Sequence, residues 1–135
     1  MKRNMATVLI LILVLLCGCS VSAGEGVSEG PAQIGEYKLI SQEEALLMMN
    51  EDALILDVRE EDEYDSGHIP GAIRISAVDV AVLAPETILD KEQVILIYCK
   101  SGKRSEAAAR ALCDAGYVNV YDFGGILSWE GEIVQ

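Results

Sequence analysis

Residues 94–116 read VILIYCKSGKRSEAAARALCDAG and carry the signals of a strand, a tight turn and a helix in direct succession. Residues 94–98 form an unbroken apolar run, as in strands that are buried on both faces of a sheet. The apolar residues of 104–115 recur at helical spacing, at Ala108, Ala111, Leu112 and Ala115. Gly116 is a suitable stop for that helix. The stretch therefore predicts a buried strand that leads through a polar turn into a helix.

Further strand and helix signals alternate along the rest of the chain. Apolar or β-branched runs predict four more strands, at 37–40, 53–58, 72–76 and 118–123. One helix is expected at 41–49, because Ser41 and Glu44 have the spacing of a capping box. Another is expected at 77–83, ended by Pro85.

The remaining segments complete the predicted fold. The acidic stretch at 60–72 is interpreted as a loop and turn, and Gly124-Gly125 leads into a short helical turn that carries Trp129. Strands that alternate with helices indicate an α/β fold, with a five-stranded, mainly parallel sheet and helices on both faces. In such sheets, ligands bind beyond the carboxyl ends of the strands. Cys99 directly follows a predicted strand and is at that kind of position.

The N-terminal residues differ in character from the rest. Two basic residues precede an apolar run over 5–16, which is too short to span a bilayer comfortably and is typical of a signal peptide. Residues 16–19, LCGC, resemble the bacterial lipobox, in which a cysteine is lipidated and becomes the mature N-terminus.

These features predict the organisation of the chain. We expect a signal peptide at 1–18, a lipidated Cys19 with a flexible Gly/Ser/Glu-rich tether at 19–36, and one folded domain at 37–135. The protein would then be exported to the cell envelope and held at a membrane through its lipid alone. Cleavage after Ala23 would instead give a soluble periplasmic or secreted protein.

The charge of the chain is strongly acidic overall but basic around Cys99. The formal net charge is -12 and the sequence pI is about 4.3, without a basic stripe, which argues against a nucleic-acid partner. Four basic residues nevertheless fall within eleven positions: Lys100, Lys103, Arg104 and Arg110. This local positive charge suggests a site for a small anion.

The loop after Cys99 contains what a thiolate needs. A helix N-terminus carries partial positive charge, and free backbone N–H groups in the turn can point at the sulfur. Gly102 allows the backbone to curl tightly, while Lys100, Lys103 and Arg104 add full charges. The alternative is an inert buried cysteine with solvated lysines nearby.

This loop resembles the active-site loop of the rhodaneses, the thiosulfate sulfurtransferases, over residues 99–105, CKSGKRS. Residues 56–72 contain LDVR, EY and GHIPGA, similar to the N-terminal signature of that family. Residues 115–129 contain AGY, VY, GGI and a tryptophan, similar to its C-terminal signature. The resemblance spans about residues 37–135.

The resemblance implies a double displacement. Cys99 would take the outer sulfur of a small anionic donor such as thiosulfate, form a persulfide, and pass that sulfur to cyanide or a thiol. The substrate would be bound by the rest of the loop, namely Lys100, Ser101, Gly102, Lys103 and Arg104. No metal or organic cofactor is implied, and the oligomeric state is not indicated.

Two other functions stay open. In a non-catalytic sulfur carrier or binding module, Cys99 would receive sulfur from a partner without turning over thiosulfate. Phosphatases and arsenate reductases with a similar sheet place five residues between cysteine and arginine, whereas four residues separate Cys99 from Arg104 here. The shorter loop favours a single sulfur atom over a tetrahedral phosphate.

Several other side chains have structural interpretations. His68 is the single histidine and lies in the GHIPGA turn. The folded domain has only this histidine and two cysteines, spaced fourteen positions apart, which argues against a zinc site. Arg59 is expected to pair with Glu63 or Asp57 and to support the loops around the site. Trp129 is expected to anchor the C-terminal turn in the core. Cys113 is expected to lie off the main apolar face of its helix as a partly buried residue, too far from Cys99 to be its resolving thiol.

Overall fold

The computed structural model describes residues 35–135, which form an α/β fold built on a five-stranded sheet. The strand order is β1-β5-β4-β2-β3, and every neighbouring pair is parallel. The strands are β1 (Lys38–Leu39), β2 (Leu54–Asp57), β3 (Ile73–Arg74), β4 (Ile95–Cys99) and β5 (Val120–Gly125). The expected fold class and all five expected strands are confirmed. The signal peptide, Cys19 and the tether up to residue 34 lie outside the described residues.

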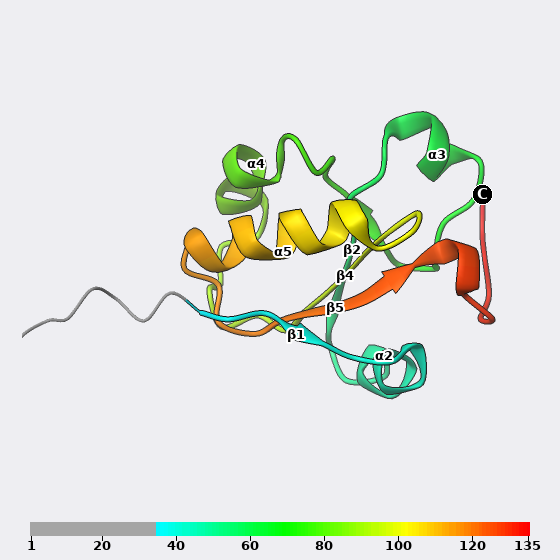
Figure 1. Cartoon of the computed structure of the whole chain (residues 1–135), viewed down its shortest axis with the longest axis horizontal. Coiled ribbons are helices and arrows are strands. Elements are labelled where there is room, and N and C mark those ends of the chain that lie inside the picture. Colours follow the sequence, from blue (N-terminus) through cyan, green and yellow to red (C-terminus); the bar gives the residue numbers. More distant parts are fainter. Residues whose placement is uncertain (1–34) are drawn as a thin grey trace, which may run out of the picture. The chain divides into compact units, whose positions relative to one another are not determined.

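Helices cover both faces of this sheet (Figure 1). They are α2 (Gln42–Met49), α3 (Glu61–Asp65), α4 (Val80–Thr87) and α5 (Lys103–Asp114), with a short 3-10 helix, η1 (Ile126–Ser128), after β5. Helices α4 and α5 pack on one face, and α2 packs on the other. Among residues 35–135, no helix combines the length and the apolar character needed to cross a bilayer.

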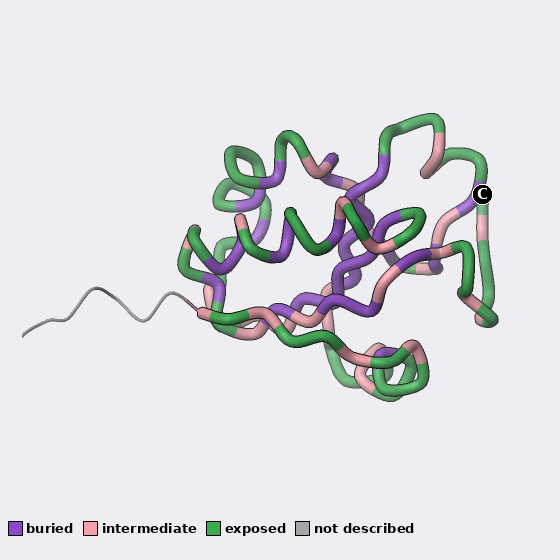
Figure 2. The backbone as a smooth tube through the Cα atoms, viewed as in Figure 1, coloured by how far each residue is buried: buried purple, intermediate pink, exposed green. Residues whose placement is uncertain are grey.

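The central strand β4 shows why the sheet is buried on both faces. Alternate residues of a strand point to opposite faces. Ile95, Ile97 and Cys99 pack under α4 and α5, whereas Leu96 and Tyr98 pack on the side of α2. All five are fully buried, and the buried segments of the backbone gather along the middle strands (Figure 2). Cys99 is thus fixed by the core at the carboxyl end of β4.

Helix α4 differs from the helix expected at 77–83, because it begins at Val80 and continues through Pro85 to Thr87. Residues 76–79 form a turn instead, in which the Ser76 hydroxyl donates to the Asp79 carboxylate at 2.8 Å. A proline inside a helix removes one backbone donor. The carbonyl that loses its partner belongs to exposed Ala81, where water can replace it. The proline therefore does not end the helix.

The stretch expected to be an acidic loop contains a helix, α3. Its N-terminus is closed by the Glu63 carboxylate, which accepts the N–H of Glu60 at 3.2 Å. Acidic side chains in the first turn of a helix interact favourably with its dipole. The same charge run that suggested a solvated loop therefore favours one short helix, and this helix brings Glu63 to the active-site loop.

Candidate active site

Cys99 lies at the junction of β4 and α5, and its sulfur occupies the position of a helix cap. The N-cap residue of α5 is Gly102, in the left-handed region at φ 99°, and it has no side chain with which to cap the helix. Its own N–H donates to Cys99 Sγ at 3.0 Å. The free N–H groups of the first helical turn thus have an anion acceptor in the sulfur.

This environment favours the thiolate. Burial acts to raise the pKa of Cys99, but hydrogen bonds from the N–H and hydroxyl of Ser105, and from the N–H groups of Gly102 and Ser101, outweigh it. The net effect is a pKa below the usual value for a thiol. The lysines and arginine that drew attention in the sequence are therefore not the main cause. The groups that lower the pKa most are the N–H groups of Ser105, Gly102 and Ser101 and the Ser105 hydroxyl.

A second segment supports the loop from behind. The pairing of β4 with β5 is irregular here, with Ile97 opposite Asp122 but Cys99 opposite Gly125. A Cβ atom on Gly125 would lie 2.7 Å from Ser101 Cα, so only glycine fits. The N–H of Leu127 also donates to the carbonyl O of Lys100 at 3.2 Å. The end of β5 and the start of η1 thus hold the backbone of residues 99–104, called the sulfur loop below.

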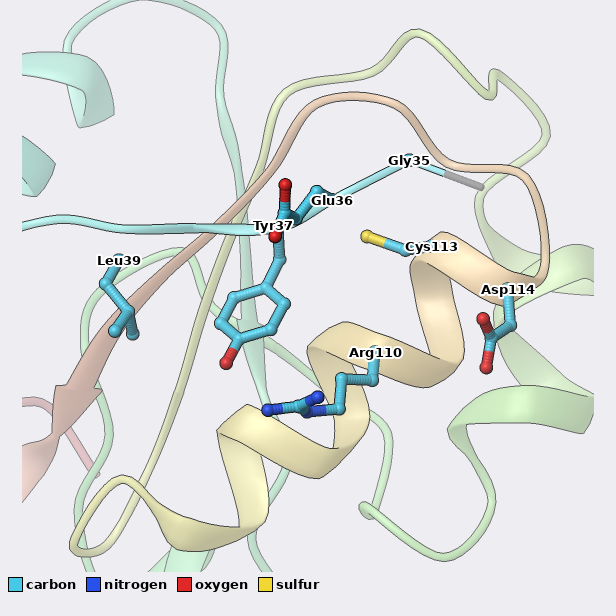
Figure 3. A pocket seen from close by; sticks show the side chains of 7 residues that line it. All are labelled: Gly35, Glu36, Tyr37, Leu39, Arg110, Cys113 and Asp114. Carbon is cyan, nitrogen blue, oxygen red and sulfur yellow. The ribbon is translucent and has the colours of Figure 1, made fainter. Parts of the chain in front are cut away.

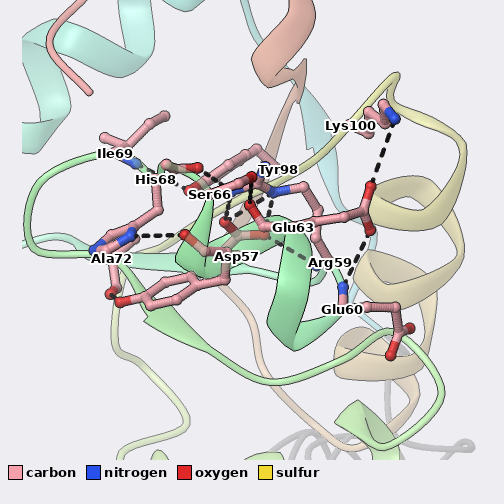
Figure 4. Close-up of polar contacts among 12 residues, drawn as sticks. Asp57, Arg59, Glu60, Glu63, Ser66, His68, Ile69, Ala72, Tyr98 and Lys100 are labelled. Carbon is pink, nitrogen blue, oxygen red and sulfur yellow. Dashed lines mark hydrogen bonds and ion pairs between the residues drawn. The ribbon is translucent and has the colours of Figure 1, made fainter. Parts of the chain in front are cut away.

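The cations of the loop have different partners. Glu63 forms a two-point ion pair with Arg104, at 2.6 and 2.9 Å, and its carboxylate lies 4.0 Å from the Lys100 ammonium. The Arg104 guanidinium lowers the pKa of Glu63 to about 2. Figure 4 shows Glu63 reaching toward Lys100. Lys103 is exposed, and no carboxylate in residues 35–135 lies within ion-pair distance of it.

A buried ion pair supports the loops at the neighbouring strand end. Arg59 pairs with Asp57 at 2.6 Å, rather than with Glu63, and also donates to the carbonyl O of Gly67 at 2.8 Å (Figure 4). The Tyr98 hydroxyl accepts the N–H of Ile69 at 3.2 Å. The end of β2 and the 67–69 turn are therefore joined to the reverse side of β4.

This combination of fold and loop occurs in a known family. Residues 41–132 match the family model described as the rhodanese-like domain. The chain belongs to the rhodanese-like domain family.

Two relatives and one solved structure document the similarity. Thiosulfate sulfurtransferase GlpE of Pseudoalteromonas translucida is 38% identical over 96 residues, which cover 70% of this chain and 90% of that protein. The putative sulfur carrier protein YrkF of Bacillus subtilis is 37% identical over 110 residues, which cover 81% of this chain but only 58% of YrkF. A structure described as rhodanese with anions from E. coli has a TM-score of 0.58 at 29% identity, covering 62% of this chain and 98% of that one.

In this rhodanese-like domain, His68 and Trp129 contribute to the fold. His68 stacks on Tyr64 with ring centroids 3.7 Å apart, and its backbone pairs with Val134. Trp129 is partly buried and packs against the core on the α2 side, with its ring centroid 5.6 Å from that of Phe123, in agreement with the expected anchoring of the C-terminal turn. Both are therefore structural side chains here.

Cys113 is more buried than the sequence suggested. It was expected off the apolar face of its helix, but it is 4% exposed and belongs to the core between α5 and the sheet. The buried face of α5 is wider than one stripe, because the segment before β1 also packs on it. Tyr37 is part of that packing. Burial raises the pKa of the Cys113 thiol.

The two cysteines among residues 35–135, Cys99 and Cys113, lie at opposite ends of α5 and are both free thiols. Cys113 borders a cavity of about 640 Å³, together with Tyr37 and Arg110 (Figure 3). This cavity is at the end of α5 away from the sulfur loop. It is therefore separate from the reaction centre.

Two buried polar residues next to the loop were not singled out as site residues from the sequence. Ser105 is fully buried beside Cys99, and Asp122 is 2% exposed at the end of β5, where it accepts the N–H of Gly124 at 2.9 Å. Burial raises the pKa of Asp122. Ser105 is the last residue of the CKSGKRS motif at 99–105, but its burial had no signal in the sequence. Asp122 had none apart from its position before two glycines.

Proposed function

We propose that this rhodanese-like domain is a sulfurtransferase that moves sulfane sulfur from thiosulfate or a related donor to a thiol or cyanide. The observation that carries the proposal is the Cys99 sulfur, set at the N-terminus of α5 and bound by the N–H groups of its own loop. A thiolate held in this way is a nucleophile that needs no separate base.

The reaction proceeds through two displacements at sulfur. The Cys99 thiolate attacks the outer sulfur of thiosulfate, a bond forms to Sγ, and the S–S bond of the donor breaks, so that its electron pair leaves with sulfite. Cys99 then carries a persulfide anion. An acceptor thiolate or cyanide attacks the outer sulfur, and the electron pair of the broken S–S bond returns to Cys99 as a thiolate.

The charges of the loop suit an anionic donor. Lys103 is exposed in the first turn of α5, four residues after Cys99, and is available to the sulfonate oxygens of thiosulfate. The two-point pair with Glu63 fixes the position of Arg104 before the donor arrives, and the more exposed Lys100 lies 4.0 Å from the same carboxylate. We propose that Lys103 supplies most of the attraction and that the other two cations complete the oxygen site.

The alternative function is a sulfur carrier, and the similarity to YrkF favours keeping it. A carrier needs the same thiolate but takes its sulfur from a protein or low-molecular-weight persulfide. The two functions therefore differ in the donor and not in Cys99.

One experiment separates them. The full chain is given thiosulfate and cyanide, thiocyanate is measured, and the mass of the chain is checked for one added sulfur atom. We expect turnover in the wild type and in Cys113→Ser, and none in Cys99→Ser. Sulfur loading from a persulfide donor without turnover of thiosulfate would indicate a carrier. The absence of both sulfur loading and thiosulfate turnover would overturn both functions.

We further propose that the protein is exported and anchored through a lipid on Cys19. The support is the charged and apolar start of the chain followed by LCGC. Mass spectrometry of the protein from its native membrane should find an acylated N-terminal Cys19. A mature N-terminus at Gly24 would contradict the anchor.

A further inference from the structure

Glu63 is a carboxylate that reaches the sulfur loop from a different element, helix α3. Its two oxygens accept from the two terminal nitrogens of Arg104, at 2.6 and 2.9 Å. One of them also lies 4.0 Å from the Lys100 ammonium (Figure 4). A single carboxylate outside the loop therefore faces two of the three cations that the loop and the first turn of α5 present to an anion.

The Glu63 side chain is held in this position by its own helix. Its carboxylate accepts the N–H of Glu60 at 3.2 Å at the start of α3. Helix α3 is held in turn by the Tyr64 hydroxyl, which donates to the carbonyl O of Ala72 at 2.7 Å. The carboxylate is thus in place before a donor binds. A donor anion has to compete with it for the guanidinium of Arg104.

The charges at the reaction centre largely cancel as a result. Positive charge comes from Lys100, Lys103 and Arg104, and negative charge from Glu63 and the Cys99 thiolate. The hydrogen bonds from Arg104 lower the pKa of Glu63 to about 2, so its carboxylate is ionised at neutral pH. The three cations exceed the two anions by one charge. A donor with one negative charge matches this surplus, whereas a donor with two exceeds it.

We propose that Glu63 is a specificity-determining residue that favours sulfur donors with one negative charge, such as an alkyl thiosulfonate, over the dianion thiosulfate. The inference rests on the proposed function, because it names the class of donor for the same site. In the loading step the Cys99 thiolate attacks the outer sulfur of the thiosulfonate, and the S–S bond of the donor breaks. The electron pair of that bond leaves with the sulfinate, and Cys99 carries the persulfide anion.

Two ratios measured on the full chain report the charge preference. The first is kcat/KM for thiosulfate divided by kcat/KM for methanethiosulfonate, with cyanide as the acceptor. The second is the alkylation rate of Cys99 by iodoacetate divided by the rate by iodoacetamide, followed by mass spectrometry of the Cys99 peptide. Within each ratio the two reagents differ by one negative charge. The thiolate fraction of Cys99 cancels in both, so a changed thiol pKa does not alter them.

Removing the charge of Glu63 should raise both ratios by a similar factor. A nearby unit charge in a partly solvated site changes the attraction of a second charge roughly fivefold. Glu63→Gln should therefore raise each ratio about fivefold at low ionic strength, and by less at high ionic strength. Glu61→Gln is the control, because Glu61 is exposed on the same helix and has no ion pair among residues 35–135. It should leave both ratios close to those of the wild type.

A matched pair separates the charge of Glu63 from the shape of its side chain. Glu63→Gln keeps the length and loses the charge, whereas Glu63→Asp keeps the charge and shortens the side chain. We expect the aspartate variant to retain the wild-type ratios, even if its KM for both donors rises. Equal ratios in folded glutamine and aspartate variants would overturn the proposal.

The two ratios also distinguish failure of this proposal from failure of the proposed function. If the wild type turns over neither donor, sulfur transfer from these donors is refuted. The alkylation ratio does not depend on sulfur transfer, so an unchanged value in Glu63→Gln would still refute the charge preference at Cys99.

Discussion

Replacing Glu63 by glutamine should destabilise the protein at neutral pH, and this destabilisation should disappear at acidic pH. Glu63 is the carboxylate that joins α3 to the sulfur loop through Arg104 and Lys100. Its pKa falls from 4.5 to about 2 in the folded protein, mainly because of the hydrogen bonds from Arg104. A folded pKa below the unfolded one means that the ionised carboxylate stabilises the fold above the unfolded pKa. That contribution is lost as the pH falls toward about 2.

The shift sets the size of the effect. It corresponds to about 3 kcal/mol if taken in full. The Arg104 side chain is 34% exposed and Glu63 is 21% exposed, so solvent screening reduces this to about 1.5 kcal/mol. The difference between wild type and Glu63→Gln should be constant from about pH 5 to 8, and should fall to less than half by about pH 3.

Urea unfolding measures this directly. The free energy of unfolding of both proteins is determined at neutral pH and at several acidic values, and the two curves are compared. Glu106→Gln is a suitable control, because Glu106 forms an exposed ion pair with Arg110, and both residues lie on α5. A Glu63→Gln protein as stable as the wild type at pH 7 would refute the role given to the ion pair. A difference that persists unchanged below pH 3 would refute its electrostatic origin.

Three other changes test the site. Lys103→Ala should raise the KM for thiosulfate several-fold with little change in stability, because its ammonium is exposed and unpaired within residues 35–135; steady-state kinetics and urea unfolding check this. Gly125→Ala should reduce turnover at least about tenfold, because the new methyl group would overlap the backbone of Lys100, and the thiocyanate assay measures the loss. Cys99 should be alkylated at lower pH than Cys113, because hydrogen bonds lower the pKa of the first thiol and burial raises that of the second. A lower alkylation midpoint for Cys113, measured on the two peptides, would reverse this assignment.

The elements predicted well from the sequence are those whose signals are local. The apolar run before Cys99 allowed one interpretation, and β4 ends within a residue of the expected place. Ser41 and Glu44 form the capping box that their spacing predicted, with the Glu44 N–H 3.1 Å from the Ser41 hydroxyl. In both cases neighbouring residues alone determine the backbone.

The misjudged elements depend on contacts that no local pattern reveals. Pro85 suggested the end of a helix, but exposure of the affected carbonyl made it tolerable in α4. The width of the buried face of α5 depended on a segment more than seventy residues away in sequence, so Cys113 was placed wrongly.

The residues of the candidate site also differ in whether a local sequence pattern identifies them. Cys99 and its loop were identified from a contiguous motif, whereas the ion pair of Arg104 with Glu63 joins residues 41 positions apart. Serine is a common residue type at the N-terminus of a helix, so the identity of Ser105 indicated nothing unusual. Only its burial beside the sulfur distinguishes it.

The glycine N-cap of α5 means that this helix is completed by the reactive atom. In most helices the cap is an inert oxygen, and the chemical state of the protein leaves it unchanged. Here the acceptor at the N-terminus of α5 is the Cys99 sulfur, which the proposed function loads and unloads in every cycle. If Cys99 carries sulfur as proposed, the free energy of unfolding depends on whether the persulfide is present, because the two forms of the sulfur accept these hydrogen bonds differently.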